Sequence, residues 1–392
     1  MSEFSPSSVA IVGAGPAGLM AAEVLAAAGA TVTVYDRMPS VARKFLMAGR
    51  GGLNLTHSEP MERFLTRYGK RALALRPGLE AFSARDLRAW ADGLGAETFV
   101  GSSGRVFPKA MKASPLLRAW LKRLEGLGVV VHTRHDWRGW DGKALMFEGP
   151  NGPIRVKTDA TILALGGASW PRLGGDGGWA PFLSAKGVEI APFQPANVGF
   201  GVDWSPLMIE KFAGTPLKTV ALTFCGKTVR GEVMLTKYGI EGGAIYALSS
   251  ALRDAITRDG HADLLVDLTP DLNAGQVISK LGRASPKDSQ SNRLRKALNL
   301  SPAAIALVFE AKASDVKAVP VRLTKAQGLE RAISSAGGIR FDAVTDAFEL
   351  KALPGVYAVG EMLDWEAPTG GYLLQACFST AVYAAQAILR AQ

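Results

Sequence analysis

The stretch "SVAIVGAGPAGLMAAEVLAAAGATVTVYD", residues 8–36, decides the fold. It opens with a short run rich in β-branched residues, turns through several glycines, and continues as an alanine-rich segment with apolar residues at helical spacing. Alternating Val and Thr then follow, which is typical of a strand. This order of strand, turn, helix and strand predicts one βαβ unit, and such a unit requires a parallel sheet with a right-handed crossover.

The glycines of this turn, Gly13, Gly15 and Gly18, have the spacing G-x-G-x-x-G. At this spacing Gly13 allows a tight turn, Gly15 lets the backbone approach a pyrophosphate, and Gly18 lets helix and strand pack closely. Glycine is so frequent in this chain that the spacing alone is a weak signal, but the motif follows a strand, opens a helix and precedes Asp36 at the end of the next strand. The helix N-terminus favours phosphate, and the carboxylate can accept hydrogen bonds from a ribose. We therefore predict dinucleotide binding; a βαβ unit without a ligand is the alternative.

Composition indicates a globular protein of more than one domain. A chain of 392 residues exceeds one ordinary core, and 48% apolar with 20% charged residues excludes a disordered chain. Cys225 and Cys377 form no C-x-x-C, and the four histidines show no metal-binding spacing, so we expect neither a metal site nor a dithiol centre. His132 and His135, three apart in an expected strand, should point to opposite faces. Few thiols, no signal-peptide pattern and no membrane-length apolar run favour a cytoplasmic protein.

The net charge of +10 raises the question of an anionic partner. Residues 280–296, "KLGRASPKDSQSNRLRK", contain six Lys or Arg against one Asp. A solvated helical face is the favoured interpretation. Nucleic-acid binding is disfavoured because the segment has no aromatic residues that could stack on bases.

The pattern changes along the chain suggest that one domain interrupts another. Helical alternation weakens from about residue 191, strand-like runs follow, residues 271–316 are helical again, and a buried-type strand and a long helix end the chain. We predict three domains. The α/β domain is built from both chain ends (1–190 and 331–392), the inserted β-rich domain covers 191–270 with 317–330, and the small helical domain covers 271–316.

A second glycine-rich turn occurs in "GEMLDWEAPTGGYLLQA", residues 360–376. A sheet that binds NAD needs nothing from the far end of the chain, but FAD is longer and its flavin must also be held. A strand ending in Gly360-Glu361 could bring a backbone N–H to the pyrophosphate and a carboxylate to the ribityl hydroxyls. The turn at Gly370-Gly371 starts the last helix, whose N–H groups could favour an anionic reduced flavin by about 1 kcal/mol. The two turns therefore predict the two ends of one FAD.

The sequence resembles a known family, the YhiN/BaiN-like FAD-binding proteins, also labelled aminoacetone oxidase-like, within the two-dinucleotide-binding flavoprotein superfamily. The resemblance spans nearly the whole chain and is carried by "GAGPAGLMAA", "ARKFLMAGRGGLNLTH", "GRVFPKAMKA", "LALGGASWP", "GEVMLTKYGIEGGAIY", "SAGGIRFD" and "GEMLDWEAPTGGYLLQA". It implies a Rossmann-like FAD-binding domain made of both chain ends, together with the inserted β-rich and small helical domains, and the activity of an FAD-dependent oxidoreductase.

The resemblance also implies a set of cofactor-binding residues. The ADP half would be held by Gly13, Gly15, Pro16, Ala17, Gly18, Asp36 and Arg37. The flavin side would be lined by Lys44, Gly49, Gly51 and Asn54. The Trp137 backbone would meet the adenine, and Ala164 and Gly166 would end the crossover strand beside the cofactor. The flavin site would be closed by Gly360, Glu361, Asp364, Gly371, Tyr372 and Leu373.

Two positions depart from the family pattern. The family commonly has Gly-Arg-Cys-Asn where this chain has Gly-Gly-Leu-Asn at 51–54, and Asn where this chain has Leu374. A cysteine-dependent function at the first place is therefore disfavoured. The two changes suggest a subgroup with a substrate of its own.

Substrate-facing residues are less certain, and no catalytic acid or base is identified. Arg105 and Lys109 are candidates for attracting an anionic substrate, with surface solvation as the alternative. Tyr238 could face the flavin from the inserted domain, and Trp365 could shield the ring, with ordinary packing as the alternative for both.

The predicted function is oxidation or reduction of a small molecule by hydride transfer through flavin N5, with NAD(P)H or O2 as candidates for the other electron partner. No second G-x-G-x-x-G occurs, so NAD(P)H would bind only transiently. An FAD-dependent RNA-modifying enzyme and a flavin-bearing sensor without turnover are the alternatives. The substrate, the electron partner and the oligomeric state are not indicated.

Overall fold

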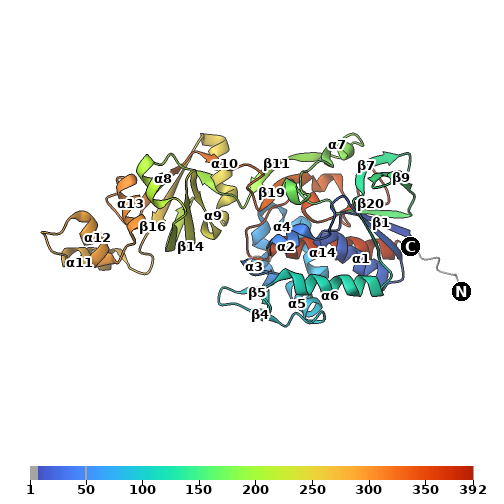
Figure 1. The fold of residues 1–392 in the computed structure, drawn as a ribbon, viewed down its shortest axis with the longest axis horizontal. Helices are drawn as coiled ribbons and strands as arrows, with labels where there is room; N and C mark the ends of the chain where they lie inside the picture. The colour runs from blue at the N-terminus through green and yellow to red at the C-terminus, as the bar shows by residue number, and fades with distance from the viewer. Residues whose placement is uncertain (1–7, 49–50, 392) are drawn as a thin grey trace. The chain divides into compact units, whose positions relative to one another are not determined.

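The computed structural model describes residues 8–48 and 51–391 and divides into two compact units (Figure 1). The first unit consists of Met1–Gln194 and Ser334–Gln392, and the second of Pro195–Ile333. Each unit has its own hydrophobic core. The further division of the insertion into a β-rich and a helical domain stays a prediction.

A five-stranded parallel sheet forms the centre of the first unit, with the order β20-β10-β1-β2-β6. Its strands are β1 (Ser8–Val12), β2 (Thr31–Asp36), β6 (Val130–Thr133), β10 (Ala160–Leu163) and β20 (Val356–Ala358). Helix α1 (Pro16–Ala27) connects β1 to β2, which confirms the predicted βαβ unit. Because β20 pairs with β10, strands from both chain ends belong to one sheet, and the predicted Rossmann-like α/β fold is confirmed.

Close backbone contacts explain why two of the motif glycines are required. Gly13 has a positive φ of 106°, and a Cβ atom there would lie 2.3 Å from the carbonyl oxygen of Ala164, at the end of β10. A Cβ atom at Gly18 would lie 1.9 Å from the carbonyl oxygen of Gly13. Any larger residue would push α1 or β10 away from the turn.

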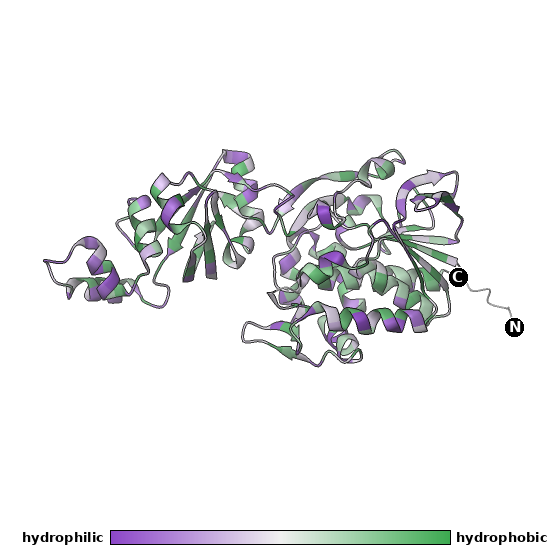
Figure 2. Ribbon diagram, in the orientation of Figure 1, coloured by the Kyte–Doolittle hydropathy of each residue, from purple (hydrophilic) through white to green (hydrophobic). Residues whose placement is uncertain are grey.

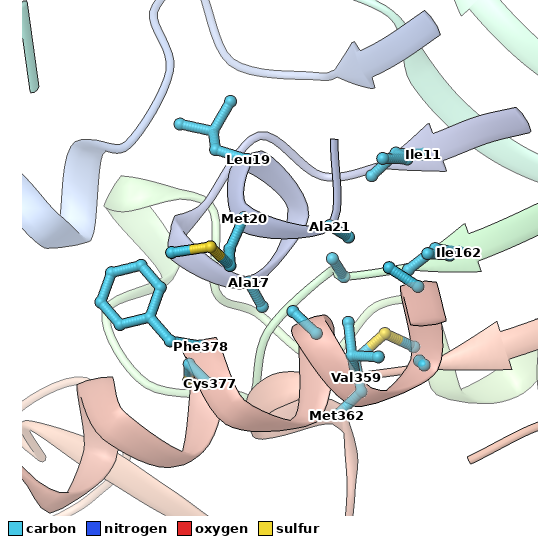
Figure 3. Packing of buried hydrophobic residues seen from close by; sticks show 14 of the residues in the cluster. Ile11, Ala17, Leu19, Met20, Ala21, Ile162, Val359, Met362, Cys377 and Phe378 are labelled. Atoms are coloured by element: carbon cyan, nitrogen blue, oxygen red, sulfur yellow. The ribbon is translucent and has the colours of Figure 1, made fainter. Parts of the chain in front are cut away.

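The first and last helices of the chain pack against each other in the same core. Helix α14 (Tyr372–Arg390) lies beside α1. Figure 3 shows Ala17 and Met20 of α1 close to Cys377 and Phe378 of α14. These four side chains are all less than 10% exposed, and short side chains such as that of Ala17 allow the two helices to approach closely.

Helix α14 is the one described helix that is long and apolar enough to cross a membrane. Buried residues make up 61% of its apolar window, and they pack inside the first unit. Figure 2 shows hydrophobic colour along the parallel strands that this core surrounds. The apolar character of α14 is therefore explained by its place in the core.

The remaining elements of the first unit surround this core. Its other helices are α2 (Arg43–Ala48), α3 (Met61–Leu65), α4 (Ala72–Ala81), α5 (Ala84–Asp92), α6 (Ala113–Gly126) and α7 (Ala180–Ser184), with 3-10 turns η2 (Thr66–Arg71), η3 (Pro171–Leu173), η4 (Phe341–Ala343) and η5 (Gly360–Met362). One antiparallel sheet contains β3 (Thr56–His57), β5 (Arg105–Pro108) and β4 (Thr98–Val100). A second contains β7 (Asp136–Asp141), β8 (Ala144–Gly149) and β9 (Gly152–Val156). A two-stranded sheet pairs β11 (Ile190–Ala196) with β19 (Ser334–Ile339).

The second unit is built on an antiparallel sheet of seven strands, in the order β17-β16-β13-β14-β15-β12-β18. The strands are β12 (Phe200–Gly201), β13 (Pro216–Phe224), β14 (Lys227–Thr236), β15 (Gly239–Glu241), β16 (Ala262–Asp267), β17 (Val319–Leu323) and β18 (Lys325–Ala326). The helices are α8 (Pro206–Phe212), α9 (Gly243–Tyr246), α10 (Ser249–Asp259), α11 (Ala274–Gly282), α12 (Gln290–Leu298) and α13 (Pro302–Glu310). Most basic side chains of the segment 280–296 are exposed on or beside α11 and α12.

The expectation that His132 and His135 point to opposite faces is wrong. Their ring centroids lie 5.2 Å apart, and both rings contact the ring of Tyr35. The reason is that β6 ends at Thr133 and Arg134 adopts a left-handed φ of 59°, which interrupts the alternation of a strand.

Substitution of Gly13 tests the contact between the first turn and β10. We expect Gly13→Ala to lower the free energy of unfolding by about 3 kcal/mol or more, because left-handed strain and a backbone clash add together. Gly29→Ala is the matched control, since Gly29 has a similar φ of 92° but open space around its Cβ position. It should cost about 1–2 kcal/mol. Urea unfolding of both variants gives the comparison, and equal losses would contradict the predicted contact.

Candidate cofactor site

The first glycine turn leaves a helix N-terminus free for a ligand. Gly15 is the N-cap of α1, no side chain caps the first turn, and that turn holds no acidic residue. Among residues 8–48 and 51–391, no atom lies within 4 Å of the Cβ position of Gly15, so this part of the chain leaves the space in front of the turn open. By contrast, Ser83 caps α5 with its own side chain. The first turn of α1 therefore has the N–H groups and the positive dipole end that bind phosphate.

Asp36 lies at the end of β2 and holds the same turn. Its carboxylate accepts hydrogen bonds from the backbone N–H of Ala14 and of Met38, each at 2.7 Å. Burial raises the pKa of Asp36 above its ordinary value, although these hydrogen bonds and the charge of Arg37 act in the opposite direction. The carboxylate oxygens keep lone pairs that can accept from a ligand hydroxyl.

Arg37 connects the end of β2 to the glycine-rich loop after β10. Its guanidinium forms an ion pair with Asp176 at 2.8 Å and donates to the carbonyl of Gly174 at 2.7 Å. Gly166, at the start of this loop, has a φ of 73° and open space at its Cβ position. Its carbonyl accepts from the Trp179 indole at 2.8 Å. The loop is thus fixed by side chains, while Gly166 at its start faces open space.

An ion pair joins the first segments of the chain to its tail. The Lys44 Nζ atom, on α2, lies 2.7 Å from Glu361 Oε2 and 3.1 Å from Ser169 Oγ. Both ionic side chains are mostly buried, with 26% and 15% of their area exposed. Lys44, Ser169 and Glu361 come from three distant segments, so the contact fixes α2, the loop after β10 and η5 together.

The Gly360 turn is supported from within the protein. Its N–H donates to Thr380 Oγ1 at 3.0 Å, and its carbonyl accepts from the Trp365 indole at 2.8 Å. Trp365 is 3% exposed and packs edge-on against Tyr68. Asp364 forms an ion pair with Arg71. The Gly360 N–H is therefore already used, and Trp365 packs beneath the turn.

The second glycine turn also starts a helix without a side-chain cap. Gly371 is the N-cap of α14 with a φ of 91°, and the first turn of α14 contains no acidic residue. A Cβ atom at Gly371 would lie 2.5 Å from the Cα atom of Thr56, so β3 approaches the turn directly. Like that of α1, this helix N-terminus lacks a side-chain cap and carries the positive end of the helix dipole, but β3 packs against its glycine.

Tyr372, the first residue of α14, is fixed through its hydroxyl, its ring and its backbone carbonyl. Its hydroxyl donates to Glu59 Oε1 at 2.7 Å, its ring stacks on His57 at 5.5 Å, and its carbonyl accepts from the Tyr68 hydroxyl at 2.8 Å. Burial and the hydrogen bond to Glu59 raise the pKa of Tyr372 well above its usual value. Tyr372 is therefore a neutral hydrogen-bond donor at physiological pH.

Glu59 is the anchor of this cluster. Its side chain is 5% exposed, and Arg67 donates to both carboxylate oxygens at 2.9 and 2.7 Å. Burial would raise the pKa of Glu59, but the hydrogen bonds from Arg67 and Tyr372 and the charge of Arg67 outweigh it and hold the pKa below its ordinary value of 4.5.

The described residues fit a long cofactor with a diphosphate. Helices α1 and α14 begin at glycines without side-chain caps, and the Cβ positions of Gly15, Gly51 and Gly166 face open space. Asn54 Oδ1 is buried and, within residues 8–48 and 51–391, has no hydrogen-bond partner. A buried acceptor without a partner is rare in folded proteins, and a ligand donor would satisfy it.

The other predicted cofactor residues lie as follows. Trp137 is buried edge-on against Trp140 and Phe182, and its indole nitrogen has no partner in the described part of the chain. Pro16 and Ala17 begin α1, Ala164 meets Gly13, and Leu373 is half-buried in α14. Gly49 lies outside the described residues.

The substrate-facing candidates are less concentrated. Arg105 is exposed on β5, and Lys109 is exposed and forms an ion pair with Glu97 at 2.7 Å. Tyr238 lies in the second unit, where its hydroxyl donates to Glu241 and the Arg331 guanidinium lies 4.6 Å from its ring centroid. The part these three residues play stays a prediction.

Sequence reasoning missed several residues that hold the site. Glu59, Ser169 and Arg71 each support a residue of the predicted set, as do Thr56 and Tyr68. Each acts across more than a hundred residues of sequence, and no local pattern marks such a contact. The one available signal was that Thr56 and Glu59 lie in or directly beside the stretch "LNLTH".

A family model described as HI0933-like protein Rossmann domain matches residues 7–387. The chain belongs to this family. The family resemblance drawn from the sequence is therefore confirmed, and the match spans both glycine turns.

Two named relatives align over nearly the whole chain. A 3-dehydro-bile acid delta(4,6)-reductase of Clostridium scindens is 26% identical over 97% of this chain and 98% of its own length. A ribosomal RNA dihydrouridine synthase of Haemophilus influenzae is 24% identical over the full length of both chains. Among solved structures, a 3-ketosteroid-delta4-(5alpha)-dehydrogenase from Rhodococcus jostii is similar with a TM-score of 0.53 and 15% identity over 98% of each chain, and this likeness shows the fold alone.

The Glu59 cluster gives a pH-dependent prediction for this HI0933-like chain. Because the pKa of Glu59 is lower in the folded state, its stabilising contribution is present above the unfolded pKa and is lost as the pH falls through the folded pKa. We expect Glu59→Gln to lower the free energy of unfolding at pH 7 by about 1.5–3 kcal/mol, the range for a hydrogen bond to a charged group. The difference from wild type should shrink between pH 5 and pH 3, measured by urea unfolding.

Glu62→Gln is the control for this experiment, because the Glu62 carboxylate is 77% exposed and pairs with Arg76 at the surface. This variant should change stability little at any pH. A difference between Glu59→Gln and wild type that stays constant down to pH 3 would contradict the assignment of a buried, ionised Glu59.

Proposed function

We propose that this chain is an FAD-dependent oxidoreductase that acts on a small molecule. The observation that carries the proposal is the packing of α1 and α14, two helices that begin at glycine turns and lack side-chain caps. One such N-terminus suits a phosphate, and a second on the same sheet suits a ligand with two ends to hold. The bridge from Lys44 to Glu361 supports this assignment because it joins α2, which follows the first turn, to η5, which precedes the second.

The proposed roles follow from the position of each group. The first turn of α1 and Asp36 would hold the diphosphate and the ribose of the ADP half. Glu361, kept in place by Lys44, would accept from ribityl hydroxyls. The positive end of α14 at Gly371 would stabilise negative charge on the flavin by about 0.3–1 kcal/mol. FAD supplies hydride transfer at its N5 atom when bound.

The names of the relatives suggest a substrate class. A delta(4,6)-reductase and a dihydrouridine synthase both name the addition of hydrogen across a carbon–carbon double bond. We propose that the substrate of this chain has such a bond conjugated to a carbonyl group, because the carbonyl accepts the charge that hydride addition creates. NAD(P)H is the proposed electron source, and O2 is the alternative electron acceptor.

An RNA substrate is a second candidate, favoured by one observation. The second unit has 18 Lys and Arg against 13 Asp and Glu, an excess of five, and residues 280–296 have the same excess, with six basic residues against one acidic. Residues 280–296, which contain the end of α11, most of α12 and their connection, therefore carry as large an excess of positive charge as the whole unit. A polyanion would contact this segment electrostatically.

The test begins with the visible spectrum of the purified chain, saturated with FAD and freed of excess. We expect flavin absorbance, bleaching by NADH or NADPH without oxygen, and return of the colour on addition of 2-cyclohexenone, a conjugated ketone. The saturated ketone should leave the flavin reduced. A chain that takes up no FAD would overturn the cofactor proposal, and a reducible flavin that no conjugated carbonyl reoxidises would overturn the substrate class.

Fluorescence anisotropy with a labelled RNA hairpin separates the second candidate from the first. RNA binding that weakens steeply between 50 and 200 mM salt, together with reoxidation of the reduced flavin by uridine-containing RNA, would favour an RNA substrate. Absence of both would leave the small-molecule reductase.

Asp36 gives the sharpest variant for cofactor binding. We expect Asp36→Ala to raise the dissociation constant for FAD by about tenfold or more, because it removes a charged acceptor worth about 1.5–3 kcal/mol per hydrogen bond. Asp141→Ala, which removes an exposed carboxylate on β7, should bind FAD like wild type. Quenching of flavin fluorescence by the cofactor-free protein measures both constants. Equal affinities in the two variants would contradict the role of Asp36.

A further inference from the structure

A cavity of about 490 Å³ lies in the first unit, and its lining residues His57 and Glu59 contact Tyr372 at the start of α14. It is lined by the end of β3 and by α3, α4, α5 and α14, and its lining includes none of the predicted cofactor residues. Its volume falls within the range of about 300–1,000 Å³ that is typical of small-molecule sites.

The inner side of this cavity is apolar and its polar groups are satisfied. Phe64 and Leu79 contribute side chains that are 2% and 1% exposed. Gln375 is fully buried, and its amide accepts from Thr56 Oγ1 at 2.7 Å and donates to the Phe82 carbonyl at 2.8 Å. Phe64 and Leu79 therefore lie beneath the cavity, and the apolar surface that a ligand can reach comes from the half-buried Met61 and Ala84 and the exposed Ala89, with no unsatisfied donor or acceptor from Gln375.

The charged groups of the cavity leave an excess of positive charge. Arg85 is exposed on α5 and, among the residues that the structure describes, forms no ion pair or hydrogen bond, and Arg88 has only a 3.5 Å contact with Thr98 Oγ1. The two carboxylates of the lining are already occupied. Glu59 is held by Arg67, and Asp92 accepts from the backbone and the hydroxyl of Thr98. Asp92 keeps its negative charge, because the Thr98 groups that donate to it are neutral, so the two arginines leave one positive charge in excess once Arg67 is counted against Glu59.

We propose that this cavity is a second binding site, for a small amphipathic anion. A carboxylate or sulfonate would contact Arg85 and Arg88, and an apolar body would lie against Met61 and Ala89. An arginine with no protein partner is well suited to such a group because its planar fork of donors matches two anionic oxygens. The cavity also shares Glu59 and Gln375 with the contacts that hold the start of α14.

The test uses two probes that differ by one charge. The full chain, with excess FAD present throughout, is titrated with 1-anilinonaphthalene-8-sulfonate and with the uncharged N-phenyl-1-naphthylamine, and the fluorescence of each probe is followed. Four variants are compared with wild type, and Arg85→Lys is the conservative partner of the first. Arg85→Gln removes the charge, Ala89→Trp fills the cavity from α5, and Arg118→Gln removes an exposed arginine on α6 as the control. Circular dichroism checks that each variant is folded.

We expect saturable binding of the sulfonate at one site in the wild-type chain and in Arg118→Gln. Arg85→Gln should weaken sulfonate binding by about fivefold to tenfold and leave the uncharged probe within about twofold, and Arg85→Lys should restore part of the loss. Ala89→Trp should weaken both probes. Sulfonate binding that does not saturate, or that responds equally to Arg85→Gln and Arg118→Gln, would overturn the proposal, as would an Ala89→Trp variant that binds both probes like wild type.

Discussion

A backbone carbonyl, that of Ala164, occupies the place where any residue other than glycine at position 13 would put its side chain. This contact sets the spacing between β1 and β10, and β10 in turn pairs with β20 from the far end of the chain. Once the three strands are adjacent, α1 and α14 begin on the same side of the molecule's first unit and can pack through small side chains (Figure 3). The position of both glycine turns depends on this close approach.

The helix ends show how the same backbone can serve structure or ligand. Helices α5, α8, α11, α12 and α13 begin at a Ser or Asn whose side chain satisfies a backbone N–H. Helices α1 and α14 begin at glycines, and the N-terminal donors of each lack a side-chain acceptor. The stabilisation that a cap would provide, about 1 kcal/mol, is absent there. Helices α3, α4, α6, α7, α9 and α10 also begin without a side-chain cap. The assignment of the two turns to a charged cofactor therefore rests on their glycines together with Asn54 Oδ1, which has no partner among the described residues.

Local patterns predicted the fold better than the site. Hydrophobic periodicity and glycine positions act over a few residues, and they indicate the βαβ unit, the last helix and the interruption of the first domain. The contacts of Lys44 with Glu361 and of Glu59 with Tyr372 join residues about 300 positions apart, and only the folded chain brings them together. The prediction that His132 and His135 point to opposite faces was wrong for a local reason, because the left-handed Arg134 between them interrupts the strand pattern. Residue types alone do not mark such a position unless it is a glycine.

A crystal structure of the chain grown with FAD tests the central claim most directly. The account predicts one FAD molecule in the first unit, with its diphosphate at the N-terminus of α1 beside Gly15 and its isoalloxazine ring at the N-terminus of α14 beside Gly371. It also predicts that Asn54 Oδ1 gains a hydrogen-bond donor from the cofactor. A flavin bound away from Gly371, or a diphosphate that does not contact the turn at Gly15, would contradict the claim that the two ends of the chain hold one cofactor.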